Sequence, residues 1–132
     1  MAEQLTLVVS TINKEHNFLG LFDEAKKVWL KEREFQANGA EELFLIWKKM
    51  FPLKSLANLK KVVIDQSAGS FSGLRLSLAV TNSLKIAYPK VKLFSTKAQN
   101  ILILKKNVEK NIDIKEEKDF ALPEYSHKPS IT

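Results

Sequence analysis

The stretch of chain that best indicates the fold lies at residues 65–75, which read Asp65-Gln66-Ser67-Ala68-Gly69-Ser70-Phe71-Ser72-Gly73-Leu74-Arg75. It follows an apolar run at residues 62–64, typical of a buried strand, and leads into residues 71–88, which have the composition of a helix. The two glycines allow a tight turn between these elements. Neither the Gly-Lys-Ser/Thr of a P-loop nor a Gly-x-Gly-x-x-Gly fingerprint is present. Spacing alone therefore favours a structural glycine turn over a phosphate cradle.

Upstream of this stretch, short apolar runs alternate with polar turns. Residues 5–9, 18–22 and Val28–Phe35 predict three strands, and their close spacing indicates an antiparallel meander. Residues 40–51 predict a helix that ends before Pro52. This helix is apolar around much of its circumference, more than contact with one sheet requires.

Downstream, residues 91–94 predict another strand. The pair Ser95-Thr96 is expected to cap the element that follows it. That element, at residues 97–105, is either a helix or a helix followed by a strand. The resulting order, βββ-α-β-α-β, predicts an α/β fold with a mixed five-stranded sheet and flanking helices. That order is found in single lobes of the ribonuclease-H-like fold, the fold of the actin and sugar kinase superfamily. We expect this lobe to span residues 1–105 and a polar extension to span residues 106–132.

Composition narrows the classes of protein that need to be considered. The 132 residues contain no cysteine, which excludes disulfide scaffolds, zinc–thiolate sites and cysteine nucleophiles. No apolar run is long enough to cross a membrane, and the first residues lack the pattern of a secretory signal. A cytoplasmic protein is the expectation. The formal net charge is +6, but only two of the 21 basic residues are arginine, which weakens a reading based on base-specific recognition.

The segment Gly69–Arg75 resembles the Gly-Pro-Gly-Ser-Phe-Thr-Gly-Leu-Arg signature of the bacterial TsaB (YeaZ) family. The resemblance extends over roughly residues 4–100, and residues 123–129 are similar to that family's terminal Pro-x-Tyr-x-Arg-x-Pro. Three features depart from the family: Val8-Val9-Ser10-Thr11 lacks the aspartate that the family usually has near the end of the first strand, Gly39 replaces a histidine, and Ser67-Ala68 replaces Gly-Pro. The chain is also too short for the second lobe, which we expect to have been lost between about residues 105 and 120.

The resemblance implies a scaffolding role. TsaB proteins are non-catalytic partners of TsaD and, with the ATPase TsaE, support formation of N6-threonylcarbamoyladenosine in tRNA. They pair with TsaD through two helices of this lobe, and a homodimer can use the same surface. The expected interface residues here are Leu43, Trp47, Met50, Phe51, Leu74, Leu78 and Thr81. The family motif loop is Gly69, Ser70, Phe71, Ser72, Gly73, Leu74 and Arg75. No cofactor is expected on this chain alone, whereas ATP or ADP and Mg²⁺ are expected at the complex, with tRNA contacted only indirectly.

Other functions remain open from the residues alone. A small enzyme of the ribonuclease-H or kinase type would need clustered carboxylates, for which Asp23, Asp65, Glu41 and Glu42 are the acids to consider. A stand-alone RNA-binding module would use the lysines, but the sequence shows neither an RNA-recognition signature nor aromatic residues interleaved on a basic strand. A third reading is that both helices simply belong to the core of the monomer.

Overall fold

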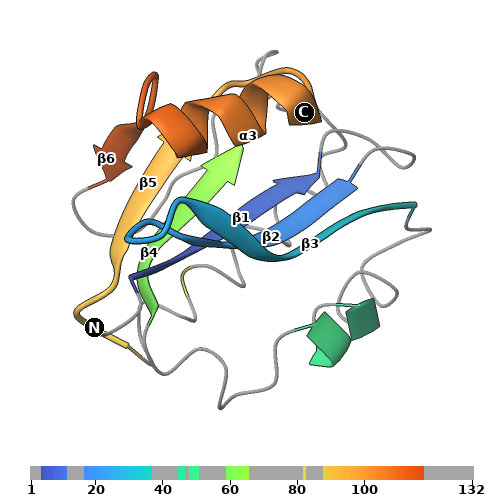
Figure 1. Ribbon diagram of the computed structural model, residues 1–132, viewed down its shortest axis with the longest axis horizontal. Coiled ribbons are helices and arrows are strands. Elements are labelled where there is room, and N and C mark those ends of the chain that lie inside the picture. The colour runs from blue at the N-terminus through green and yellow to red at the C-terminus, as the bar shows by residue number, and fades with distance from the viewer. Residues whose placement is uncertain are drawn as a thin grey trace, which may run out of the picture.

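The structure is a computed structural model that describes residues 4–11, 17–36, 45–46, 48–50, 59–65, 82 and 88–117. These residues form a six-stranded sheet with the helix α3 (Ile101–Lys110) lying across one face (Figure 1). The strands are β1 (Leu5–Thr11), β2 (Asn17–Asp23), β3 (Val28–Phe35), β4 (Leu59–Asp65), β5 (Lys92–Thr96) and β6 (Lys115–Glu117). The α/β fold class and the five strands expected from the sequence are confirmed.

The strand order is β3-β2-β1-β4-β5-β6. β1, β2 and β3 form the predicted antiparallel meander, whereas β4 pairs in parallel with both β1 and β5. The parallel arrangement places the carboxyl ends of β1, β4 and β5 at one edge of the sheet and their amino ends at the opposite edge. This mixed sheet, with the meander on one side, therefore brings residues from different strands together at each end of the parallel strands.

The core consists of two layers because each strand sends alternate side chains to opposite faces. On the face that α3 covers, Leu104 and Val108 of the helix pack against Val8, Phe18 and Val63 of the sheet. On the other face, the cluster includes Leu7, Leu19, Val62, Ile64 and Leu93, and Ile46, Met50 and Tyr88 pack partly against it. No helix among the described residues is long and apolar enough to cross a membrane.

The third helix differs from the prediction at both ends. Ser95-Thr96 is not its cap, because both residues belong to β5. The cap is Asn100, whose side chain accepts a hydrogen bond from the Ile103 N–H at 2.8 Å. The helix continues past residue 105 to Lys110 and ends where Asn111 adopts the left-handed conformation, at φ 53°.

A sixth strand, β6, was not predicted. Its sequence Lys115-Glu116-Glu117 is charged throughout, yet it pairs antiparallel with β5 at the edge of the sheet. Short, charged edge strands are common because they discourage pairing with other chains, and they carry no apolar pattern for a sequence reading to detect. The boundary predicted at residue 105 thus falls within α3, and the division into lobe and extension remains a prediction.

Candidate functional site

Three buried polar residues lie side by side at the carboxyl edge of the parallel strands. The register pairs Ser10 of β1 with Asp65 of β4, and Asp65 with Thr96 of β5. All three are almost fully buried. In open α/β sheets this edge is where ligands usually bind, since loops from neighbouring strands converge there.

The hydrogen bonds of this cluster hold the sheet to the segment around α3. Ser10 Oγ donates to Asp65 Oδ2 at 3.0 Å, and the Ala98 N–H donates to Asp65 Oδ1 at 3.1 Å. Asn107 Nδ2, from the middle of α3, donates to Thr96 Oγ1 at 3.3 Å. Thr96 Oγ1 in turn donates to the carbonyl of Asp113 at 2.9 Å. Both oxygens of Asp65 therefore accept structural hydrogen bonds.

Of the four acids considered for catalysis, Glu41 and Glu42 lie outside the described residues, and Asp23 and Asp65 lie at opposite ends of the sheet. Asp23 is opposite Leu5 in the register, whereas Asp65 is opposite Ser10. At about 3.3 Å per residue, these positions are about 17 Å apart along β1. Asp23 Oδ1 accepts hydrogen bonds from the Ala25 and Lys26 N–H groups and so shapes the β2–β3 turn. Within the described ranges, no group of three or more potential ligands is gathered for a metal ion.

Most of the predicted interface lies outside the described residues. This holds for Leu43, Trp47, Phe51, Leu74, Leu78 and Thr81. It also holds for the whole motif loop, Gly69, Ser70, Phe71, Ser72, Gly73, Leu74 and Arg75. Residues 45–46 and 48–50 are helical, as predicted for residues 40–51. Within them, Met50 packs partly against the core, and its carbonyl accepts a hydrogen bond from Lys31 Nζ at 2.9 Å.

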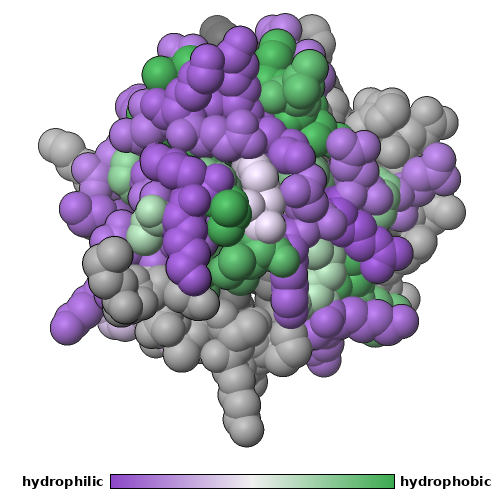
Figure 2. All heavy atoms as spheres, in the orientation of Figure 1, coloured by the Kyte–Doolittle hydropathy of each residue, from purple (hydrophilic) through white to green (hydrophobic). Residues whose placement is uncertain are grey.

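Leu45 is an exposed apolar residue of the same helical segment, with 59% of its surface accessible. Ile46 and Met50 face the sheet, so this segment has an inner side and an outer side. By contrast, the described surface on the α3 side of the molecule is mostly hydrophilic, with apolar side chains only in small patches (Figure 2). Leu102 of α3 is the most exposed large apolar side chain among the described residues, at 80%.

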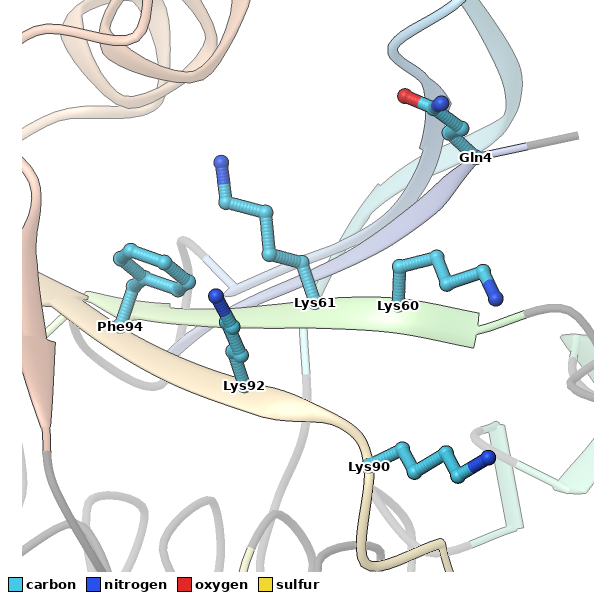
Figure 3. Close-up of a pocket in the computed structure, with 6 residues that line it drawn as sticks. All are labelled: Gln4, Lys60, Lys61, Lys90, Lys92 and Phe94. Carbon is cyan, nitrogen blue, oxygen red and sulfur yellow. The ribbon is translucent and has the colours of Figure 1, made fainter.

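A basic groove at the amino edge of the sheet was missed by the sequence reading (Figure 3). It has a volume of about 380 Å³ and is lined by Gln4, Lys60, Lys61, Lys90, Lys92 and Phe94. The sequence contains two lysines at the start of each of two apolar strands, Lys60 and Lys61 at one and Lys90 and Lys92 at the other. This pattern becomes informative only once β4 and β5 are known to be parallel neighbours, because that pairing places Lys61 beside Lys92.

Comparison with known proteins bears on the fold. No protein-family model and no curated protein matches this sequence significantly. Among solved structures, YeaZ from Pseudomonas aeruginosa superposes with a TM-score of 0.58 and 16% sequence identity over 72% of this chain. This chain has the fold of YeaZ. The resemblance to the TsaB (YeaZ) family noted in the sequence is thus confirmed at the level of the fold.

A second solved structure gives the same result. It is described as an uncharacterized protein with similarity to peptidase YeaZ from Pseudomonas aeruginosa, and it matches with a TM-score of 0.55 and 16% identity over 72% of this chain. The present chain spans less than half of both YeaZ-type proteins, 43% of the first and 44% of the second. The fold shared with YeaZ is therefore that of one part of a longer molecule.

Proposed function

We propose that this chain is a non-catalytic accessory subunit that binds a TsaD-type protein and supports formation of N6-threonylcarbamoyladenosine in tRNA. The observation that carries this proposal is the YeaZ fold in combination with the Gly69–Arg75 motif, which begins shortly after β4 in the sequence. The fold alone would leave the function open, because one fold serves many activities. The motif ties this example of the fold to the TsaB family.

The contact with TsaD would use the two apolar helices predicted from the sequence. The outward-facing Leu45 supports an apolar outer surface on the first of them. Burying such a surface against TsaD would favour the active conformation of TsaD only to the extent that this chain binds that conformation more tightly. TsaE would join the complex, a homodimer would form through the same surface when TsaD is absent, and the complex would act in the cytoplasm.

The hydrogen bonds that Asp65 accepts within the protein support the proposed non-catalytic role. The end of the first strand lacks the aspartate usual in the family. There the Ser10 hydroxyl donates a hydrogen bond to Asp65 Oδ2, and the Ala98 N–H donates one to Asp65 Oδ1. These groups do not fit a Mg²⁺ site, which needs oxygen atoms directed at the ion rather than at each other. ATP or ADP and Mg²⁺ would therefore be held by other subunits of the complex.

The proposal can be tested by co-expressing this chain with tagged TsaD from the same genome. We expect the wild-type chain to co-purify with TsaD, and the variants Trp47→Glu and Leu78→Glu to be lost from the complex. A charge inserted into an apolar interface leaves a buried, unpaired group. The matched control is Leu102→Glu, an exposed leucine on the α3 side of the sheet, which should still co-purify.

Circular dichroism and size-exclusion chromatography of each variant would show that its fold is retained. Reconstituted modification of tRNA, measured by mass spectrometry of nucleosides, should require the wild-type chain and fail with both interface variants. If the wild-type chain does not bind TsaD, or if both variants bind as well as the control, the accessory role through these helices is wrong.

A further inference from the structure

We propose that the basic groove at the amino edge of the sheet binds single-stranded RNA, with its lysines on the phosphates and Phe94 against a base. This goes beyond the accessory role above, which gives the chain a protein contact only. It also does not depend on that role, since the groove belongs to the described sheet and not to the predicted interface helices.

The register of the sheet builds this groove. Lys61 of β4 pairs with Lys92 of β5, and Val63 pairs with Phe94 two residues further on. Lys61 Nζ lies 4.6 Å from the centre of the Phe94 ring, so the two side chains share the α3 side of the sheet. In Figure 3 the side chains of Lys61, Lys92 and Phe94 rise from the same side of β4 and β5, and Lys60 and Lys90 extend along the rim. The groove therefore opens on the face of the sheet that α3 packs against.

Two acidic residues lie near the groove, since Glu24 pairs with Lys61 and Glu116 of β6 lies opposite Phe94 in the register, but most of the groove's lysines form no ion pair with a described residue. Lys61 forms an ion pair with Glu24 at 2.9 Å. Within the described part of the chain, Lys60, Lys90 and Lys92 form no ion pair, and all three are exposed. Lysines gathered in a hollow repel one another and raise the local concentration of anions. A polyanion is therefore the class of ligand that the groove fits best.

Phe94 favours a single-stranded nucleic acid over other polyanions. Its ring packs partly against the apolar cluster under α3 and lines the groove, with Lys61 Nζ over the ring. A base would stack on Phe94 once the Lys61 side chain turns from the ring to a phosphate. Grooves that bind single strands combine cations along the backbone with an aromatic side chain on which an unpaired base stacks. The sequence Lys90-Val91-Lys92-Leu93-Phe94 alternates basic and aromatic side chains with buried apolar ones. Lys90 precedes β5, so the strand itself contributes Lys92 and Phe94 to the groove.

The test is binding of a fluorescein-labelled oligouridylate of about 12 nucleotides to the full chain, followed by fluorescence anisotropy. Each lysine–phosphate contact on a single strand contributes about 0.7 to the logarithmic salt slope, so the three lysines without an ion pair predict a slope of about −2. Raising the NaCl concentration from about 50 to about 200 mM should then weaken binding by about 20-fold.

Two variants separate the parts of the groove. Lys92→Glu should weaken binding by about fivefold or more and make the salt slope shallower by about 0.7. Phe94→Leu keeps an apolar side chain against the cluster and removes only the aromatic face. It should also weaken binding by about fivefold, with the salt slope unchanged. The charge-matched control is Lys49→Glu, an exposed lysine in the segment that packs on the other face of the sheet, which should bind like the wild type.

Several results would overturn the proposal. These are no binding of the oligouridylate at low salt, equal effects of Lys92→Glu and Lys49→Glu, or tight binding that Phe94→Leu leaves unchanged. Binding to anionic phospholipid vesicles without binding to RNA would assign the groove to a membrane instead. Because the isolated chain is used, these outcomes say nothing about TsaD, and failure to bind TsaD would leave the RNA result intact.

Discussion

Gly20, in the middle of β2, leaves room for two aromatic rings. A Cβ atom at this position would lie 2.7 Å from Phe18 Cε1 and 2.7 Å from Trp29 Cζ3, closer than atoms can approach. The Trp29 ring fills the space above the glycine and packs against Phe22 at a centroid distance of 4.9 Å. Its Nε1 donates to Glu109 Oε2 of α3 at 2.8 Å. One absent side chain thus allows Trp29 to join the meander to the helix.

The first prediction is that Gly20→Ala lowers the free energy of unfolding by about 1 to 3 kcal/mol, because the added methyl group overpacks the site. Urea denaturation followed by circular dichroism would measure it. The double variant Gly20→Ala with Trp29→Leu should lose less than the sum of the two single changes, since the smaller side chain leaves room for the methyl group. Full additivity would contradict this account.

The second prediction concerns Asp65. Asp65→Ala leaves the Ala98 N–H and the Ser10 hydroxyl without their acceptor, and each unsatisfied buried group costs about 1 to 3 kcal/mol. We expect the free energy of unfolding to fall by at least about 2 kcal/mol, and by about 1 kcal/mol for Ser10→Ala, which removes one hydrogen bond. An Asp65→Ala variant as stable as the wild type would contradict the structural role given to this carboxylate.

At the scale of elements, α3 is held by two kinds of contact. Leu104 is completely buried against the sheet, and Asn107 reaches Thr96 at the end of β5. At its outer side, Lys105 pairs with Glu32 of β3 and lies over the Trp29 ring. The helix therefore spans the sheet from the parallel strands to the meander.

The third prediction compares two leucines of this helix. Leu104→Ala should lower the free energy of unfolding by about 2 to 5 kcal/mol, because it opens a cavity under the helix. Leu102→Ala makes the same chemical change at an exposed position and should stay within about 0.5 kcal/mol of the wild type. Thermal and urea unfolding of both variants would decide, and similar losses would mean that α3 does not pack as described.

Predictability from sequence also varies from element to element. The strands at β1, β2 and β4 were found because their buried residues form continuous apolar runs. The limits of α3 and the existence of β6 were missed because they depend on one cap residue and on backbone pairing by charged residues. At the site, Asp65 was recognised as the polar end of an apolar run. Its partners Ser10 and Ala98 are far away in sequence, and no local pattern indicates them.

At the scale of the whole molecule, the fourth prediction concerns a chain that ends at the predicted boundary, residue 105. A chain ending at residue 105 would lack the buried Asn107 and Val108 and the strand β6. We expect this shorter chain to lose the cooperative unfolding transition that the full chain shows in urea. If the shorter chain unfolds as cooperatively and at the same urea concentration as the full chain, residues 106–132 contribute nothing to stability and the predicted boundary is right.

The two faces of the sheet differ in what they offer to other molecules. The groove opens on the α3 side, whereas Ile46 and Met50 of the segment that includes the exposed Leu45 rest on the reverse side. Protein and nucleic acid would therefore occupy the chain without competing for space. In an assembly of all three molecules, an RNA bound in the groove is kept at a high effective concentration near the protein bound on the other face. If the chain is the accessory subunit proposed above, holding RNA in this way would increase the rate at which the bound enzyme meets its substrate.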